Sequence, residues 1–184
     1  MSNTSSTMLA LGTKAPDFSL LNPVNNQVQS LESLKGKKGT LVVFICNHCP
    51  FVLHIIDTLE ELYEDYKSKG IEFIGINAND VASYPADSPE MMVEFVEEKA
   101  LKFPYLYDES QDIAKAFEAA CTPDFYYFDE NLKLIYRGQM DDSRPGNQKE
   151  ITGEDLIIAF ENHLADQEQE DLQRPSLGCN IKWK

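Results

Sequence analysis

Two short apolar runs and the helical pattern between them organise the first half of the chain. Residues 40–45 and residues 71–76 are rich in β-branched and aromatic side chains without polar alternation, which is typical of strands buried on both faces. Between them, apolar residues recur at helical spacing and acidic residues fill the opposite face until Gly70 ends the pattern. The apolar positions are Val52, Ile55, Ile56, Leu59, Leu62, Tyr63 and Tyr66. We therefore predict a strand, a long amphipathic helix and a second, parallel strand with a right-handed crossover.

Shorter patterns on either side predict further strands and helices. Residues 15–21 and 27–29 flank a turn and indicate an N-terminal β-hairpin. Ser88 followed by Pro89 is typical of a helix start, because serine caps the first turn and proline is favoured at its first position. The remaining elements we expect are a strand over 103–107, a short helix over 112–119, a hairpin of 124–129 with 133–137, and a last helix that begins in a capping box at 152–155.

The sequence predicts one α/β domain flanked by two terminal segments of different composition. A length of 184 residues is that of a single domain. Residues 1–12 are small and polar, and we expect them to be flexible, so that the domain spans residues 13–165. The tail, residues 166–184, begins with a charged run that cannot bury itself. It ends with Ile181 and Trp183, which favour docking onto this domain or onto a neighbour.

The amino-acid composition excludes some classes of binding partner. Sixteen Lys and Arg residues against 31 Asp and Glu give a formal net charge of −15. Nucleic acids and anionic membranes bind clustered basic residues, so we expect neither as a partner. No apolar run approaches the ~18 residues of a membrane helix, and the first residues lack the features of a signal peptide, so we expect a cytoplasmic protein. Four cysteines are too few for a disulfide-stapled secreted fold, which favours redox or metal-binding roles for them.

Cys46 and Cys49 lie where the first buried strand ends and the long helix begins. Two thiols at this spacing can close into a disulfide with little movement of the backbone. A thiolate at a helix start is stabilised by unpaired backbone N–H groups and by the positive end of the helix dipole. Pro50 at the first helical position would make Cys49 the N-cap residue. We therefore predict Cys49 as the nucleophile and Cys46 as its resolving partner.

Other interpretations of this motif stay open. Cys46 and Cys49 could be two buried thiols, or half of a zinc site completed by His48 and His54, although this second pair lacks a conventional spacing. His48 could instead lower a thiol pKa when protonated, raise the reduction potential of the disulfide, or lie exposed in a turn without effect. We predict no metal and no cofactor.

The remaining two cysteines each allow two interpretations. Cys121 precedes the late hairpin and could be a third redox thiol or a small buried apolar residue. Cys179 lies in the tail and could reach the active site as a second resolving thiol, or lie exposed and inert. Thr122 and Pro123 open a strand that would lie beside the active-site loop, with a peptide bond that could be cis or trans.

The order of these motifs resembles the thioredoxin fold. A strand, Cys-x-x-Cys-Pro at 46–50, a long helix, and Thr-Pro opening a late hairpin carry the resemblance. Segments 12–18 and 126–138 resemble the alkyl hydroperoxide reductase/thiol-specific antioxidant branch. Segments 44–52, 140–146 and 178–183 are similar to a peroxiredoxin-like group. The resemblance covers about residues 10–165 and implies a central mixed sheet with helices on both faces and an N-terminal hairpin extension.

The chain also departs from the families it resembles. A peroxiredoxin implies a peroxidatic cysteine, here Cys49, with a threonine or serine three residues earlier, a proline seven earlier and an arginine near the later strand. Those positions hold Cys46, Val42 and Thr122. Without the hydroxyl and the guanidinium, a peroxide loses much of the electrostatic stabilisation of its leaving oxygen. The tryptophan that thioredoxins place before the first cysteine is Ile45 here.

We therefore predict a thiol–disulfide oxidoreductase. Cys49 attacks a disulfide, Cys46 resolves the mixed species, and an external dithiol reduces the resulting pair. His48, Pro50, Thr122 and Pro123 are the expected supporting residues. One alternative is an antioxidant peroxidase in which Cys49 becomes a sulfenic acid that condenses with Cys46 or Cys179. The other is a non-enzymatic or zinc-binding module. The expected substrates are protein or small-molecule disulfides or peroxides, and the oligomeric state is left open.

Overall fold

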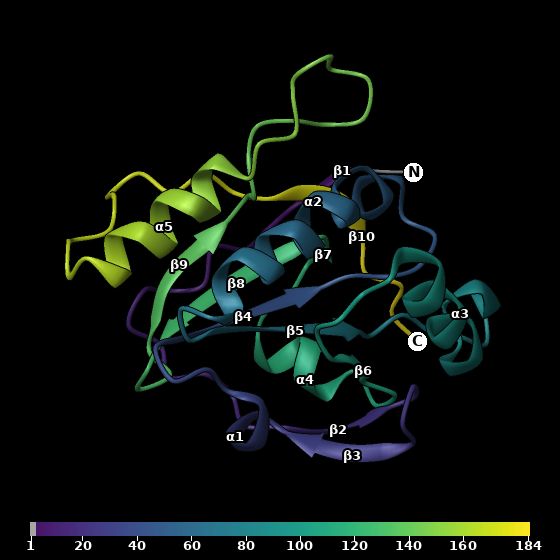
Figure 1. Ribbon diagram of the computed structural model, residues 1–184. Coiled ribbons are helices and arrows are strands. Elements are labelled where there is room, and N and C mark those ends of the chain that lie inside the picture. Colours follow the sequence, from purple (N-terminus) through teal and green to yellow (C-terminus); the bar gives the residue numbers. More distant parts are fainter. Residues whose placement is uncertain (1–2) are drawn as a thin grey trace.

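The centre of the molecule is a seven-stranded mixed sheet. The computed structural model describes residues 3–184, and its main sheet has the strand order β3-β2-β6-β5-β4-β8-β9 (Figure 1). Strand β4 (Gly39–Phe44) pairs in parallel with β5 (Ile71–Asn77) and antiparallel with β8 (Asp124–Asp129). Every residue of β4 is buried, as its uninterrupted apolar sequence predicts. The mixed sheet and the parallel β4–β5 pair confirm the predicted fold class.

The outer strands extend this sheet on both sides. The predicted N-terminal hairpin is present, but its first strand begins four residues later than expected. The strands are β2 (Ser19–Asn22), β3 (Gln27–Ser30), β6 (Tyr105–Tyr107) and β9 (Leu134–Gly138). Because β6 pairs antiparallel with β2 at Leu21 and parallel with β5, the hairpin is joined to the sheet through β6.

Helices cover both faces of the sheet, as predicted. On one face α2, α3 and α5 bury a core that includes Val52, Phe95 and Phe160. On the other, α1 and α4 pack over a second core that includes Leu31 and Ala114. Full burial of one large apolar side chain contributes about 1.5–3 kcal/mol, so the apolar face of α2 fixes that helix firmly on the sheet. The helices are α1 (Leu31–Leu34), α2 (Pro50–Lys67), α3 (Pro89–Lys99), α4 (Asp112–Ala116) and α5 (Glu154–Leu164), with a 3₁₀ turn, η1, at Pro85–Asp87.

Helix α5 begins differently from the sequence prediction. The residue at its N-cap is Gly153, with φ +68°, and no side chain caps the helix from that position. Instead, the Asp141 carboxylate accepts hydrogen bonds from the backbone N–H groups of Thr152 and Gly153 at 2.8 and 2.7 Å. The predicted capping box is therefore wrong. Asp141 accepts from the Thr152 and Gly153 N–H groups, and the Met140 carbonyl accepts from the Asp155 N–H that the Thr152 hydroxyl was expected to cap.

A second, three-stranded sheet joins both ends of the chain to the domain. Its order is β1-β10-β7, with β1 at Asn3–Ser5, β10 at Leu177–Asn180 and β7 at Cys121–Thr122. The prediction that residues 1–12 are flexible is wrong for Asn3–Ser5, which pair with the tail; residues 1–2 lie outside the described part of the chain. The tail docks on its own domain, which was one of the two expected outcomes.

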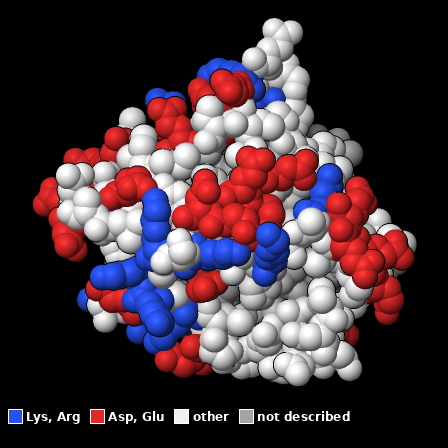
Figure 2. All heavy atoms as spheres, in the orientation of Figure 1, with Lys and Arg blue, Asp and Glu red and all other residues white. Residues whose placement is uncertain are grey.

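The surface charge is unevenly distributed. On the face shown in Figure 2, acidic side chains gather over the centre, and basic side chains lie directly below them and toward the lower left. Most acidic residues of α2 lie opposite its apolar residues, and Asp57, Glu61 and Asp65 face solvent. Glu60 departs from the predicted acidic face, because it is buried. Across residues 3–184, no helix combines the length and apolar character needed to cross a bilayer.

Candidate active site

The Cys-x-x-Cys motif lies between the end of β4 and the first turn of α2. Cys49 is the N-cap residue of α2 and Pro50 occupies its first helical turn, as predicted. The extended backbone of Cys49, with φ −71° and ψ 121°, turns the chain from the sheet into the helix. Both thiols are enclosed by protein: Cys46 is 1% and Cys49 is 0% exposed. A substrate sulfur can therefore reach Cys49 only when a neighbouring segment moves.

Thr122, in strand β7, contacts both thiols. In its protonated form the Cys49 thiol donates a hydrogen bond to the Thr122 carbonyl oxygen at 3.2 Å, and the Cys46 sulfur lies 3.6 Å from the Thr122 hydroxyl. The peptide bond between Thr122 and Pro123 is cis. The structure thus brings Cys46, Cys49, Thr122 and Pro123 together, although they come from separate parts of the sequence.

The two thiols have opposite acidities. The hydrogen bond from Cys46 is the largest influence on Cys49 and, with donors from Thr122, Cys179 and the backbone of Val52, lowers the pKa of Cys49 to about 5 against the opposing effect of burial. The same hydrogen bond to Cys49, together with burial and the negative charge of Asp87, raises the pKa of Cys46 well above its ordinary value. One proton therefore leaves the pair at low pH and the second is retained at neutral pH. This arrangement makes Cys49 a nucleophilic thiolate with a protonated thiol beside it.

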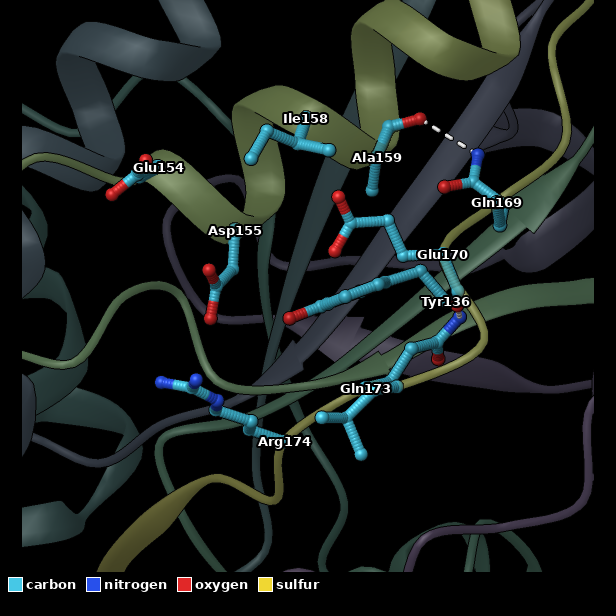
Figure 3. Close-up of a pocket in the computed structure, with 10 residues that line it drawn as sticks. Tyr136, Glu154, Asp155, Ile158, Ala159, Gln169, Glu170, Gln173 and Arg174 are labelled. Atoms are coloured by element: carbon cyan, nitrogen blue, oxygen red, sulfur yellow. Dashed lines mark hydrogen bonds between the residues drawn. The ribbon is translucent and has the colours of Figure 1, made fainter.

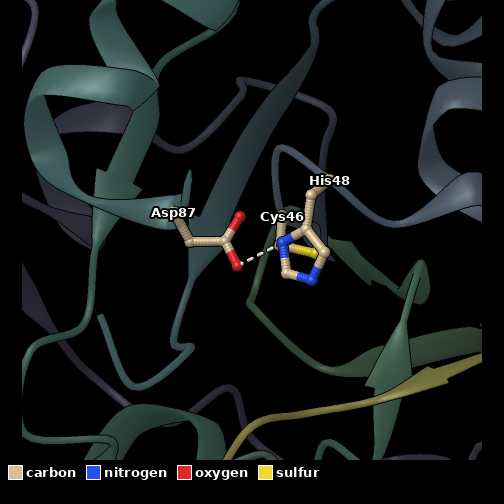
Figure 4. Close-up of side chains that lie close together, drawn as sticks. All are labelled: Cys46, His48 and Asp87. Atoms are coloured by element: carbon tan, nitrogen blue, oxygen red, sulfur yellow. Dashed lines mark ion pairs between the residues drawn. The ribbon is translucent and has the colours of Figure 1, made fainter. Parts of the chain in front are cut away.

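His48 is turned toward a buried carboxylate. Its Nδ1 points to Asp87 (Figure 4), at 2.7 Å from Asp87 Oδ2. Its ring also stacks on Tyr84, with 6.0 Å between the ring centroids. Asp87 is fully buried and also accepts hydrogen bonds from the backbone N–H of Asn47 and the side-chain amide of Asn79, each at 2.8 Å. The Asp87 carboxylate therefore fixes the loop between the two cysteines from η1.

The residues considered for a zinc site do not form one group. The ligand atoms of Cys46, His48 and Asp87 lie within 4.8 Å of one another, and this group includes neither Cys49 nor His54. Structural zinc sites use four ligands, whereas this group offers three, and both oxygens of Asp87 already accept hydrogen bonds. His54 instead lies 3.2 Å from the Ser143 hydroxyl, farther along α2. The donor set does not fit a structural zinc site.

The two remaining cysteines lie on opposite sides of the strand pair β7–β10. Cys179 is opposite Thr122 in the ladder and Cys121 is opposite Asn180. Directly opposed residues of an antiparallel pair share a face, and successive residues alternate between faces. Cys179 therefore shares the face of Thr122, toward the redox pair, and hydrogen-bonds Cys49. Cys121 points away, and burial raises the pKa of its thiol.

Several hollows lie outside the thiol cluster, one of them beside β2. A small one beside Pro123 is lined by residues of α2 and of the 139–145 loop, including Phe51, His54 and Arg144. A cavity of about 300 Å³ opens between α5 and the 169–174 segment, where Tyr136, Asp155 and Gln173 face it (Figure 3). No cysteine lines any of these hollows. The redox chemistry is thus centred on the enclosed thiols.

Sequence reasoning missed two acidic residues near this site. Asp87 lies about 40 residues from Cys46 in a polar loop whose pattern carries no signal of burial. Asp124 directly follows Pro123, and burial raises its pKa to about 7 although Ala120 N–H and the Tyr126 hydroxyl donate hydrogen bonds to it. An acidic residue after the Thr-Pro pair was the only available hint.

Known proteins have similar sequences and similar folds. The chain is 29% identical to the thiol-disulfide oxidoreductase ResA of Geobacillus kaustophilus over 140 residues, which is 74% of this chain and 75% of the relative. Solved structures include an uncharacterized conserved protein from Geobacillus kaustophilus, with 50% identity, a TM-score of 0.98, and coverage of 100% of this chain and 97% of that one. A hypothetical protein from Sinorhizobium meliloti 1021 has 42% identity, a TM-score of 0.96 and 98% coverage of both chains.

More distant structures share the fold alone. The thioredoxin domain of a thiol-disulfide oxidoreductase from Bacteroides vulgatus has a TM-score of 0.61 with 22% identity, and covers 71% of this chain and 89% of that one. The thioredoxin-like fold expected from the motif order is therefore confirmed. Residues 10–156 match the Redoxin family, and this span contains both cysteines of the motif and the Thr122–Pro123 pair. The chain belongs to the Redoxin family.

Proposed function

We propose that this thiol–disulfide oxidoreductase acts through Cys49 as the attacking thiolate and Cys46 as the resolving thiol. The observation that carries the proposal is the pairing of a thiol of lowered pKa with a protonated thiol hydrogen-bonded to it, at a helix N-terminus. The thiol–disulfide oxidoreductase ResA relatives support the reaction class.

The reaction proceeds by two exchanges. The Cys49 thiolate attacks one sulfur of the substrate disulfide, which breaks the S–S bond and releases the other sulfur as a thiol after it takes a proton. Cys46 then loses its proton and attacks the Cys49 sulfur of the mixed disulfide. The second substrate sulfur leaves as a thiol. The two electrons delivered to the substrate come from the Cys46 and Cys49 thiols, which are oxidised to the Cys46–Cys49 disulfide. An external dithiol returns the pair to the reduced state.

The charge at Cys46 changes in the course of this reaction. In the resting protein the neighbouring Cys49 sulfur helps to raise the pKa of Cys46. Once Cys49 is bound in a mixed disulfide it no longer carries charge, so deprotonation of Cys46 becomes easier at the step that needs it. The same pair thus keeps the resolving thiol protonated until a substrate is attached.

A redox titration tests the proposal. The protein is equilibrated in glutathione buffers across about −220 to −320 mV, the range of cytosolic potentials, and its thiols are counted by alkylation and peptide mass mapping. We expect Cys46 and Cys49 to interconvert as a pair, and Cys49→Ser to abolish disulfide reductase activity. If the pair never closes at any potential, or if Cys49→Ser retains full activity, the dithiol mechanism is wrong.

We propose peroxide reduction only as a second reaction of the same thiol. Its support is the low pKa of Cys49 and the presence of neighbouring thiols that could condense with a sulfenic acid. Cys46 occupies the place of the peroxide-activating hydroxyl, so we expect this antioxidant reaction to be slower than disulfide exchange. Competing hydrogen peroxide against a disulfide substrate measures the two rates directly, and a faster peroxide reaction would reverse the assignment.

We also propose that the protein works in the cytoplasm on disulfide substrates of proteins or small molecules. The low cysteine content supports this location. Fractionation of cells that produce the full chain, with thiol trapping in each fraction, tests it. Recovery in the membrane fraction or outside the cell would contradict the proposal.

A further inference from the structure

The C-terminal strand fixes Cys179 against the redox pair. On one side of Cys179, the Ser176 hydroxyl donates a hydrogen bond to the Pro123 carbonyl at 2.6 Å. On the other side, the Ile181 N–H donates to the Ala120 carbonyl at 3.1 Å. The tail is thus held on both sides of the Thr122–Pro123 bond. Because Cys179 lies between these two anchors, its position is set by the fold.

Gly178 allows the close approach of the two strands. A Cβ atom at this position would lie 1.9 Å from the Thr122 carbonyl oxygen, so no larger residue fits without displacing backbone. The strand β10 consequently runs directly beside Thr122, the residue that contacts both thiols of the motif. Cys179 is 5% exposed and belongs to the same buried cluster as Cys46 and Cys49.

These contacts place a third thiol beside the nucleophile. We propose that Cys179 is a second resolving thiol, which competes with Cys46 for the Cys49 sulfur and forms an alternative Cys49–Cys179 disulfide. This inference rests on the proposed function of Cys49. It adds a specific chemical role for the tail and makes the C-terminal strand part of the redox site.

The exchange reactions balance without a further oxidant. In a mixed disulfide of Cys49 with a substrate, Cys179 loses its proton and attacks the Cys49 sulfur, the bond from Cys49 to the substrate breaks, and the substrate sulfur leaves as a thiol. In the oxidised protein, Cys179 attacks the Cys49 sulfur of the Cys46–Cys49 disulfide, and Cys46 leaves as a thiolate that takes up a proton. In each reaction one disulfide bond forms and one breaks, so the protein and the substrate together neither gain nor lose electrons.

The local charges differ between the two resolving thiols. The negative charge of Asp87 disfavours the thiolate of Cys46, whereas the positive charge of Lys182 favours the thiolate of Cys179. In the resting protein, burial is the main cause that raises the pKa of Cys179 to about 12, and the hydrogen bond and charge of Cys49 add to it. The contribution of Cys49 disappears when its sulfur is in a disulfide. Cys179 is therefore activated at the same step as Cys46, without an adjacent carboxylate to oppose it.

A resolution experiment with oxidised glutathione tests the role of Cys179. In Cys46→Ser, once free glutathione has been removed, the Cys49–glutathione mixed disulfide can be resolved only by another thiol of the chain. We expect this variant to release glutathione and to form a Cys49–Cys179 disulfide, seen as a linked pair of peptides after proteolysis. In the double variant Cys46→Ser/Cys179→Ser the adduct should persist, with release slowed at least about a hundredfold because the intramolecular attack is lost.

Cys121 provides the matched control, since it is buried in the same strand pair but faces away from Cys49. Cys46→Ser/Cys121→Ser should release glutathione as fast as Cys46→Ser. Equal persistence of the adduct with and without Cys179 would overturn the inference while leaving Cys49 as the nucleophile. Absence of any adduct on Cys49 would overturn the proposed function itself. Should a double variant fail to fold, the peptide map of oxidised Cys46→Ser decides alone, because a missing Cys49–Cys179 link contradicts the proposal.

Discussion

The Cys49 thiol lies 3.2 Å from the carbonyl oxygen of Thr122, the residue that precedes the cis proline. The Thr122 hydroxyl also stabilises the Cys49 thiolate and lies 3.6 Å from the Cys46 sulfur. A single residue of β7 therefore contacts both reacting groups. This contact links the position of β7 to the acidity of the nucleophile.

Removal of the Thr122 hydroxyl is expected to weaken the nucleophile at low pH. A hydrogen bond to a charged group is worth about 1.5–3 kcal/mol, so Thr122→Val should raise the pKa of Cys49 and slow its alkylation at pH 5 by about tenfold or more. Thr122→Ser keeps the hydroxyl and serves as the control. Rates of iodoacetamide labelling of Cys49, followed by peptide mass mapping, measure the effect. Equal rates for the valine and serine variants would show that the hydroxyl does not act on Cys49.

The pH profile of Cys49 tests the coupling to Cys46. Because the pKa of Cys49 is lowered to about 5, its alkylation rate should rise with a midpoint near pH 5 and stay constant from about pH 6 to neutrality. Cys46→Ala removes the largest stabilising hydrogen bond and should move this midpoint upward, whereas Cys46→Ser keeps a donor and should move it less. A midpoint at the ordinary cysteine value in the wild-type protein would contradict the assigned hydrogen bonds.

The parts of this site that sequence predicts are those built by neighbouring residues. Cys49 and Pro50 form a helix start within a single turn, so spacing alone locates them. Thr122 and Pro123 were placed near the motif through a family resemblance. Asp87 was missed because its contact with the Asn47 backbone spans 40 residues and depends on how the polar loop after β5 folds.

The C-terminal tail and the start of α5 also depend on contacts between segments that are distant in the sequence. Cys179 could be recognised as a thiol but not placed, since its position depends on the register of β10 against β7 and on the close approach at Gly178. The start of α5 was predicted as a local capping box, yet Asp141 supplies the acceptor from another loop. The packing of the whole domain sets which distant segments pair. The local pattern of apolar and polar residues does not encode this pairing.

Asp87 offers a test of the electrostatics at Cys46. Its negative charge is one cause of the raised pKa of Cys46, so Asp87→Asn should lower that pKa and accelerate resolution of the Cys49–glutathione adduct in a Cys179→Ser background. The substitution also weakens the contacts to Asn47 and His48, at a cost of about 1–3 kcal/mol in unfolding free energy. Asp108→Asn is the control, because Asp108 is buried but lies outside the groups that act on Cys46. Slower resolution in Asp87→Asn would show that Asp87 positions the loop more than it opposes the Cys46 thiolate.

Asp124 is expected to make stability fall as the pH rises. Burial raises its pKa from 3.8 to about 7, so between these values the folded protein binds more protons than the unfolded chain. The free energy of unfolding therefore decreases from about pH 4 to pH 7 and is level above it. A shift of this size corresponds to about 4 kcal/mol. Cys49 contributes with the opposite sign, since its lowered pKa increases stability as the pH rises from about 5 to 9.

Urea denaturation in a Cys49→Ser background isolates the contribution of Asp124. The parent protein should lose stability between pH 5 and pH 8, and Asp124→Asn, which cannot ionise, should lose markedly less. Asp129→Asn, at the other end of β8 and only partly buried, should keep the pH dependence of the parent. The test compares the change in unfolding free energy between pH 5 and pH 8. Any pH-independent cost of placing Asn at position 124 therefore cancels. If Asp124→Asn retained the full loss of stability, the carboxyl group would not be the one that titrates on folding.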